Sequence, residues 1–379
     1  MAILLIIAGL FLAFSNGGND NFKGVATLLG SGTTSYKQAL AWATITTFLG
    51  SVVALYLAQG LLQNFSGKGL VPDDVVKLSS FSTAVALASA LTVFAATRLG
   101  FPISTTHALT GALVGAGFMA APQGIHIHHL MNSFVAPLLL GPLLAIVGAT
   151  LLYPLASKVR RQFGVTRESC LCVGREVIAP TSSIRFVQVL PLSQPMNQMT
   201  RFIEMPTVSV GNQLSCAERY VGTFWGVDAK SAVDATHVLS AGLVSFARGL
   251  NDIPKIAAIM LAAAAVTPSQ SIVSVAMVMA LGGVVMAKRI ANTMAYEITT
   301  MNDGQGVSAN LVTSLVVIGA SRMGLPVSTT HVSCGALFGI GAVTKQAHGG
   351  AILKIALAWI TTLPLAAMLG AMLFVLLSR

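Results

Sequence analysis

The sequence predicts an all-α polytopic membrane protein, with two similar membrane halves and a small soluble insert between them. Of its 379 residues, 54% are hydrophobic and only 9% are charged, and the mean hydropathy of +0.79 exceeds that of soluble globular proteins. Several apolar runs are long enough to span a bilayer, and two polar motifs each occur twice in the same order. Broken helices or re-entrant hairpins are expected where these motifs interrupt the apolar runs.

Five apolar runs exceed the length of about 18 residues that a membrane-spanning helix needs. They cover residues 38–62, 79–97, 133–156, 268–287 and 352–378. None of them alternates polar and apolar residues, as the strands of a transmembrane barrel would. The N-terminal apolar run has no basic residue at its start, so we expect a first membrane segment rather than a cleaved signal peptide.

The chain divides into three parts, which are a first membrane repeat (1–156), a soluble insert (157–236) and a second membrane repeat (237–379). Within the insert, short alternating stretches at 183–192 and 201–210 predict some β structure. The basic cluster SKVRR directly follows a predicted span, which is typical of cytoplasmic loops. We therefore expect the insert to lie in the cytoplasm.

Three of the four cysteines, Cys170, Cys172 and Cys216, lie in the insert. This set lacks a clear fourth ligand for a zinc ion. We therefore expect reduced thiols in a cytoplasmic domain. Cys334 lies in an apolar segment and is expected to be a small packing residue.

The two membrane parts resemble each other in two blocks of sequence. FSNGGNDNFKGVA at 14–26 aligns with FARGLNDIPKIAA at 246–258, and TRLGFPISTTHALTGALVGAG at 97–117 aligns with SRMGLPVSTTHVSCGALFGIG at 321–341. Duplicated membrane units are typical of secondary transporters, whose substrate site lies between the repeats near the bilayer midplane. The alignment alone leaves open whether the repeats are parallel or inverted.

The second block carries a Ser-Thr-Thr-His sequence in each half. Its hydroxyl residues are Ser104, Thr105 and Thr106 in the first half and Ser328, Thr329 and Thr330 in the second. They can cap a helix that begins there, and a helix N-terminus offers free N–H groups and the positive end of the dipole to an anion. Such small polar residues also pack membrane helices together, but two matched copies beside matched charges favour a binding site. For His107 and His331 we expect a structural role, with proton transfer or anion binding as the alternatives.

The first block places amide and charged side chains behind an apolar run. In the two halves these residues are Asn19, Asp20 and Lys23, and Asn251, Asp252 and Lys255. Gly17 and Gly18 predict a break in the first helix, after which Asn19 or Asp20 would cap a half-helix that runs to about Leu29. Each buried charge in a bilayer costs on the order of 3 kcal/mol. Charges in both copies therefore favour binding of a substrate or ion over two merely structural ion pairs.

At these motifs the sequence resembles the inorganic phosphate transporter family called PiT. That family carries a duplicated G-A-N-D-V-A-N-A signature, which residues 17–24 and 249–256 match in part, and a duplicated P-x-S-T-T-H block, which residues 102–107 and 326–331 match in full. The resemblance implies inverted repeats, symport of inorganic phosphate with sodium or protons in the plasma (inner) membrane, and a homodimer. By position, it assigns Asn19, Asp20, Asn251 and Asp252 to the substrate and cation sites, with Asp20 and Asp252 as candidate sodium ligands, and the six hydroxyl residues to the anion.

Lys23 and Lys255 replace the second asparagine of the family signature in both halves. With asparagines, two aspartates and a dianion would place about four negative charges in the site, which bound cations must offset. Two lysines bring the fixed charge near zero. We therefore expect weaker sodium dependence and more reliance on protons, or a different oxyanion such as sulfate.

Three other functions fit parts of the pattern, namely a sulfate or other oxyanion permease, an uncoupled anion channel and a transporter-like sensor. Asp20 and Asp252 disfavour a channel, because carboxylates repel anions that travel without a cation or proton. They also favour phosphate over sulfate, because only phosphate donates a hydrogen bond to a carboxylate at neutral pH. The sequence has no nucleotide-binding loop or hydrolytic triad, so we expect neither an enzyme nor a primary pump, and its scattered basic residues predict no nucleic-acid partner.

Overall fold

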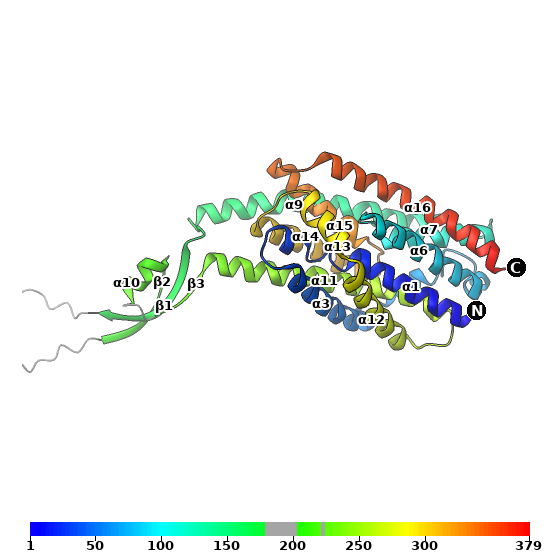
Figure 1. Cartoon of the computed structure of the whole chain (residues 1–379), viewed down its shortest axis with the longest axis horizontal. Helices are drawn as coiled ribbons and strands as arrows, with labels where there is room; N and C mark the ends of the chain where they lie inside the picture. The colour runs from blue at the N-terminus through cyan, green and yellow to red at the C-terminus, as the bar shows by residue number, and fades with distance from the viewer. Residues whose placement is uncertain (179–202, 221–223) are drawn as a thin grey trace, which may run out of the picture. The chain divides into compact units, whose positions relative to one another are not determined.

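The structure is a computed structural model that describes residues 1–178, 203–220 and 224–379. The described chain forms two compact units. The membrane unit comprises Met1–Ser157 and Thr236–Arg379, and the insert unit comprises Lys158–Ala235. In Figure 1 the membrane unit is a bundle of long helices, and the insert unit is built around a small sheet.

Helices alone build the described membrane unit. In the first half they are α1 (Ala2–Asp20), α2 (Ala26–Gly30), α3 (Tyr36–Leu57), α4 (Gln59–Phe65), α5 (Asp73–Val76), α6 (Ser79–Leu99), α7 (Thr105–Ala120), α8 (Ile127–Leu130), the π-helical turn η1 (Met131–Val135) and α9 (Ala136–Gln162). In the second half they are α11 (Ala229–Leu261), α12 (Pro268–Met286), α13 (Lys288–Asn292), the π-helical turn η2 (Thr293–Glu297), α14 (Asp303–Arg322), α15 (Thr329–Thr344) and α16 (Gly349–Leu377).

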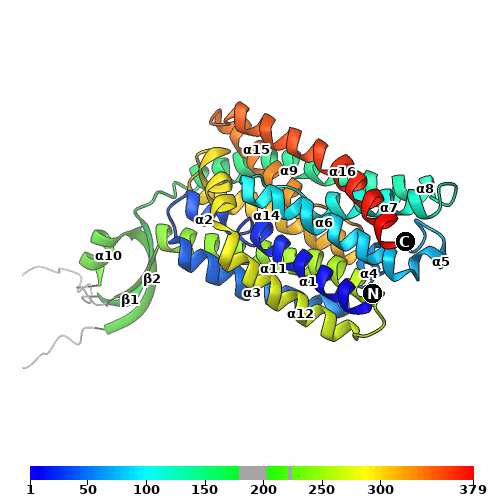
Figure 2. The same cartoon turned by 45° about the vertical axis from the view of Figure 1, so that its right-hand side comes forward.

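Six helical stretches of the described chain are long and apolar enough to cross a membrane. They are Ala2–Asp20, Tyr36–Leu57, Ser79–Leu99, Ile127–Gln162, Pro268–Met286 and Gly349–Leu377. Figure 2 shows α16 running alongside α6 and α7, which it also contacts. The prediction of an all-α multi-pass membrane protein is confirmed.

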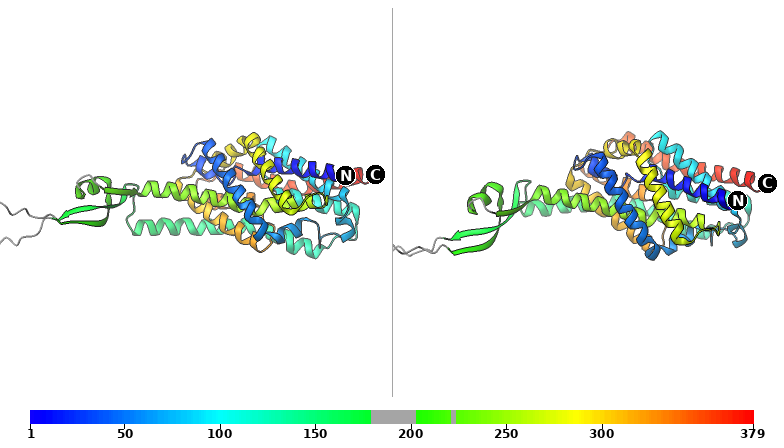
Figure 3. Two further views of the ribbon diagram at one scale, coloured as in Figure 1. Left: turned by 90° about the horizontal axis from the view of Figure 1, so that it is seen from below. Right: turned by 60° about the horizontal axis from the view of Figure 1, so that its bottom comes forward.

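The predicted break of the first helix at Gly17 and Gly18 is wrong, because α1 continues to Asp20. Figure 3 shows α1 beside α12 from two directions. A Cβ atom at Gly17 would lie 1.9 Å from the carbonyl oxygen of Met279 in α12. The glycine therefore permits close helix packing and does not end the helix.

The predicted half-helix that Asn19 or Asp20 would cap, running to about Leu29, is also wrong. A turn follows α1, in which the amide groups of Lys23 and Val25 bond to carbonyl groups three residues earlier, and α2 begins only at Ala26. In the second half, α11 runs unbroken through Asp252. The two aspartates therefore lie at the end of one helix and within another, and neither lies at a helix N-terminus.

The two Ser-Thr-Thr turns begin helices, as predicted. α6 ends at Leu99, and Gly100 follows in the left-handed conformation (φ 82°), which a glycine adopts without strain. The chain then runs without helical structure to Ser104, whose side chain accepts a hydrogen bond from the backbone N–H of His107 (3.1 Å) and caps α7. Ser328 caps α15 in the same way through the N–H of His331 (3.1 Å).

The insert unit contains an antiparallel sheet in the order β2-β1-β3. Its elements are β1 (Ser169–Ile178), β2 (Ile203–Asn212), α10 (Gln213–Arg219) and β3 (Phe224–Asp228). β2 overlaps the stretch at 201–210 that predicted β structure, whereas the stretch at 183–192 lies outside the described residues.

The expectation of reduced cysteines in the insert is wrong for two of the three. A disulfide joins Cys172 on β1 to Cys216 on α10, and Cys170 remains a thiol. The fold explains the difference, because it brings to one place three sulfur atoms that the sequence separates by up to 46 positions (216 − 170).

Candidate functional site

The motif residues of both halves meet inside the membrane unit. They come from the end of α1 and the turn after it, from the middle of α11, and from the first turns of α7 and α15. All twelve predicted site residues are buried, and none exposes more than 4% of its surface. The fold therefore brings these polar motif residues into the interior of the membrane unit.

An oxygen cage surrounds the Lys23 ammonium group. Its Nζ donates hydrogen bonds to Asn19 Oδ1 (2.7 Å), to the carbonyl oxygen of Ile103 (2.8 Å) and to Thr330 Oγ1 (2.6 Å). It also pairs with the Asp20 carboxylate. Four oxygen atoms from three segments of the chain thus hold one cation.

A matching cage surrounds the Lys255 ammonium group. Its Nζ donates to Thr106 Oγ1 (2.8 Å), to the carbonyl oxygen of Val327 (2.8 Å) and to Asp252 Oδ1 (3.3 Å). The two lysine contacts are crossed, because Lys23 of the first half reaches the Ser-Thr-Thr turn of the second half and Lys255 reaches that of the first. Each lysine therefore links the two halves.

Each aspartate, by contrast, bonds to the threonine of its own half. Asp20 Oδ2 accepts from Thr105 Oγ1 (3.3 Å) and from Asn16 Nδ2 (3.0 Å). Asp252 Oδ2 accepts from Thr329 Oγ1 (3.1 Å), and its Oδ1 also accepts from the side chain of Asn251 (2.8 Å). Both carboxylates are thus held by O–H and N–H donors in addition to the lysines.

The two site asparagines fix the extended segments that precede α7 and α15. Asn19 donates to the carbonyl oxygen of Phe101 (3.0 Å) and accepts from the backbone N–H of Ile103 (3.2 Å). Asn251 donates to the carbonyl oxygen of Val327 (3.0 Å). These bonds hold the two Ser-Thr-Thr turns against α1 and α11.

Sequence reasoning missed Arg248, which is buried with 1% of its surface exposed. Its guanidinium donates to Asn21 Oδ1 (2.8 Å) and Asn16 Oδ1 (3.3 Å), and its Nε lies 3.8 Å from Asp252 Oδ2. The alignment of the halves pairs Arg248 with Asn16, since both lie four positions before the motif aspartate. A charged residue within an otherwise matched motif was the signal that could have revealed it.

The fixed charge of the site is therefore positive. Among the described residues, Lys23, Arg248 and Lys255 contribute three cations, and Asp20 and Asp252 contribute two carboxylates, which gives a net charge of +1 when all five are ionised. The near-zero charge expected from the two lysines alone is corrected by Arg248. A buried excess cation is costly, and an anion that binds here would offset that cost.

The rings of His107 on α7 and His331 on α15 contact each other in a tilted arrangement. Their ring centroids lie 4.3 Å apart, and the ring of His331 also lies 3.8 Å from that of Trp359 on α16. The Trp359 indole donates to the carbonyl oxygen of Pro102 (3.2 Å). These ring contacts and this hydrogen bond join three helices near the turn before α7, while His107 Nδ1 and His331 Nε2 are buried without a hydrogen-bond partner among the described residues. The structural role of both histidines stays a prediction.

A polar cluster lies on one side of the site along α11. Asn310 on α14 donates to Thr27 Oγ1 (3.0 Å) and to Ser240 Oγ (3.2 Å), and Ser240 precedes Asp252 in α11 by twelve positions (252 − 240). We call these three residues the polar seal. Extending the two aligned blocks at their offsets of 232 (246 − 14) and 224 (321 − 97) positions pairs these residues with Ile259, Ala8 and Ala86 of the other half, which belong to one buried apolar cluster. Ile259 follows Asp252 in α11, so the two sides of the site differ in polarity.

Comparisons with known proteins identify the family of the chain. A model of the family described as "Phosphate transporter family" matches residues 16–370. Two relatives carry the name "Putative phosphate permease". The one from Thermococcus kodakarensis is 26% identical over 396 residues, with 98% of this chain and 96% of its own covered. The one from Haemophilus influenzae is 28% identical over 417 residues, with 97% of this chain and 94% of its own covered.

A solved structure described as "The sodium-dependent phosphate transporter" has a similar fold. It superposes with a TM-score of 0.75 at 21% sequence identity, and the match covers 100% of this chain and 98% of that one. At this identity the likeness concerns the fold, and it supports the helical architecture described above.

Proposed function

The chain belongs to the phosphate transporter family and transports phosphate, and we propose that it does so as a symporter driven by protons, with little need for sodium. The observation that carries this proposal is the pair of oxygen cages around Lys23 and Lys255. Carboxylate, carbonyl and hydroxyl oxygens are the ligands that hard cations prefer. Here the chain supplies the cation itself as an ammonium group.

The charge of the site supports a proton as the coupling ion. The fixed charge of +1 is balanced by a singly charged phosphate, or by a doubly charged phosphate together with one proton. Asp20 and Asp252 are the acids proposed to accept that proton or a hydrogen bond from the phosphate hydroxyl. Sulfate carries no proton at neutral pH, so it neutralises the site only when an aspartate is protonated, whereas a singly charged phosphate balances it with all five groups ionised.

The crossed lysine contacts suggest how binding is coupled to movement. Thr106 and Thr330 each accept a hydrogen bond from the lysine of the opposite half. An anion that binds both lysines and both turns replaces these contacts. Such an anion contacts the two halves at the same time. We propose that this exchange biases the relative positions of two inverted repeats, as alternating access requires.

Uptake of radiolabelled phosphate into proteoliposomes tests this function. We expect an inward proton gradient to drive accumulation without sodium, and an inward sodium gradient alone to drive little. Excess arsenate should compete, and excess sulfate should not. A steep requirement for several sodium ions would overturn the proposed coupling, and accumulation that follows neither gradient would indicate a channel.

The proposal extends to a homodimer in the plasma (inner) membrane, as the family resemblance implies. Crosslinking in intact membranes, followed by electrophoresis under denaturing conditions, should yield a species of twice the chain mass. Recovery of monomer alone at all crosslinker concentrations would contradict the dimer and leave the transport proposal intact.

A further inference from the structure

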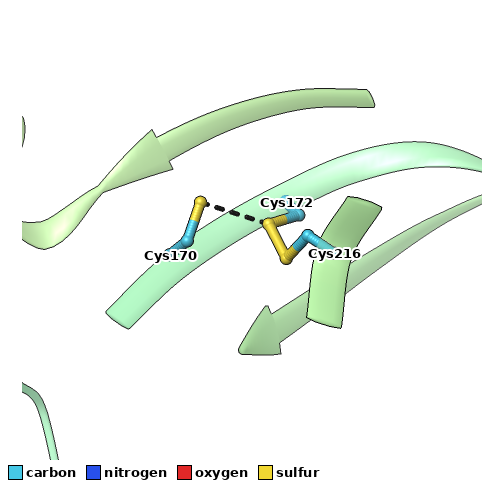
Figure 4. Close-up of side chains that lie close together, drawn as sticks. All are labelled: Cys170, Cys172 and Cys216. Atoms are coloured by element: carbon cyan, nitrogen blue, oxygen red, sulfur yellow. Dashed lines mark hydrogen bonds between the residues drawn. A yellow bond between two sulfur atoms is a disulfide. The ribbon is translucent and has the colours of Figure 1, made fainter. Parts of the chain in front are cut away.

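Three cysteine sulfur atoms converge in the insert unit. Figure 4 shows Cys170 and Cys172 side by side on β1 with Cys216 facing them from α10. All three sulfur atoms lie within 4.8 Å of one another, and the thiol of Cys170 lies 3.1 Å from Cys172 Sγ. A disulfide engages only two of these sulfur atoms, so it does not account for the position of the third.

These sulfur atoms lie in the buried core of the described part of the insert. Its buried cluster among the described residues consists of Cys170, Cys172, Cys216 and Tyr220, and each of them exposes at most 2% of its surface. The Tyr220 hydroxyl is already used in bonds to Thr207 O (3.2 Å) and Ser209 Oγ (2.9 Å) on β2. Units with so small an apolar core usually need a covalent or metal crosslink to stay folded. In the described part of the insert, the cysteine sulfur atoms are the groups that can form such a crosslink.

We propose that, in its reduced form, the insert is a trithiolate binding site for a thiophilic metal or metalloid ion, with Cys170, Cys172 and Cys216 as the three ligands. For metal–sulfur bonds of about 2.3 Å, three sulfur atoms around one ion lie about 4 Å apart. Once the disulfide is reduced, Cys172 Sγ and Cys216 Sγ are free to separate, and because all three sulfur atoms already lie within 4.8 Å of one another, side-chain rotations bring them to this spacing. Thiolate sulfur selects soft ions over hard ones.

The composition of the insert favours an ion that is satisfied by three ligands. Residues 158–235 contain no histidine and no fourth cysteine, so the usual tetrahedral zinc sets cannot be completed from this segment. Because the sulfur atoms are buried, the net charge of the bound site matters. Three thiolates around a trivalent ion make a neutral complex, whereas a monovalent ion leaves two negative charges. Trivalent arsenic is therefore the most suitable probe.

The chemistry of loading balances as follows. A dithiol reductant transfers two electrons to the Cys172–Cys216 disulfide, which yields two thiols and an oxidised dithiol. Arsenious acid then reacts with the three cysteine thiols to form three arsenic–sulfur bonds and releases three water molecules. The Cys172–Cys216 bond and arsenic binding therefore exclude each other, so the site is also sensitive to the redox state of its compartment.

Binding is tested on the full-length protein in detergent, after reduction and removal of the reductant. We expect one arsenic per chain, with Cys170, Cys172 and Cys216 protected together from alkylation, as read by peptide mass spectrometry. Cys170→Ser should weaken binding at least about tenfold. Cys334→Ser is the matched control, because Cys334 is buried in the membrane unit and should leave the stoichiometry unchanged. Protein with the disulfide intact should bind none.

Cys170→Ser keeps the test decisive even if the other variants do not fold, because it retains both partners of the disulfide. Size-exclusion elution and phosphate uptake in proteoliposomes report whether the variant is folded. Cu(I) and Zn²⁺ are titrated in the same way, and protection of all three cysteines by any of the three ions supports the trithiolate site. Unchanged binding in Cys170→Ser, or protection of only Cys172 and Cys216, would overturn it.

Discussion

Replacing both site lysines by asparagine should convert this transporter to sodium dependence. Lys23→Asn removes an ammonium that contacts four oxygen atoms, and Lys255→Asn removes one that contacts three. The oxygen ligands stay in place, and asparagine adds a further amide oxygen. The variant therefore keeps two cages of oxygen atoms and loses the two cations that the chain provides.

The expected size of the effect follows from the buried charges. Removing one partner of a buried ion pair typically costs about 3–5 kcal/mol, because the other charge is left uncompensated. Sodium present at about a hundred times its dissociation constant stabilises the state that binds it by about 2.7 kcal/mol. This free energy corresponds to about a hundredfold change in an equilibrium constant. We therefore expect sodium to restore one to two orders of magnitude of uptake in the double variant. Lys23→Asn alone should respond more strongly than Lys255→Asn, since its cage holds more oxygen ligands.

The assay is initial phosphate uptake into proteoliposomes as sodium replaces choline at constant ionic strength and pH. Uptake by the unsubstituted protein should change by less than about twofold across the series, and uptake by the double variant should rise steeply. Lys37→Asn serves as the control, because Lys37 is an exposed lysine of the same unit. Steep sodium dependence of the unsubstituted protein, or a double variant that is folded but indifferent to sodium, would refute the reasoning.

Three further substitutions test other parts of the structure. Gly17→Ala should lower the melting temperature and the yield of folded protein, since its Cβ would meet a carbonyl of α12 at 1.9 Å. Gly319→Ala is the control, because open space surrounds Gly319. It should be neutral or stabilise α14 by up to about 1 kcal/mol. Arg248→Gln should raise the KM for phosphate by about tenfold or more, because a charged donor contributes about 1.5–3 kcal/mol, and Arg248→Lys should recover part of that loss. Asn310→Leu should slow uptake more than it weakens phosphate binding, as measured by the split between the maximal rate and KM.

The sequence was sufficient to predict the class of fold and to pick out motif residues that the fold brings together, although it missed Arg248. Hydropathy identified the spans, and the doubled motifs identified residues that the fold brings together from segments more than 200 positions apart. The helix starts at Ser104 and Ser328 were predictable as well, because capping depends on local chemistry. These features depend on composition and short-range patterns, which a single sequence contains.

What could not be predicted depends on packing between distant helices. Gly17 looked like a helix break because the backbone of α12 against it is invisible in the sequence. The crossed contacts of Lys23 with Thr330 and of Lys255 with Thr106 depend on how the halves face each other, whereas the sequence suggested only pairs within each motif. The meeting of the insert cysteines likewise depends on the position of α10 against β1.

The two halves share the predicted motif residues of the site but not the residues on either side of it, and this difference bears on transport. The polar seal of Thr27, Ser240 and Asn310 offers hydrogen-bond partners to an anion or to water, whereas the aligned apolar positions in the other half offer none. Stripping a phosphate of water without replacing its hydrogen bonds is costly. We therefore expect the polar side to open through small movements that exchange one set of hydrogen bonds for another. The apolar side has to separate its helices far enough to admit water, so opening on that side should carry the larger barrier.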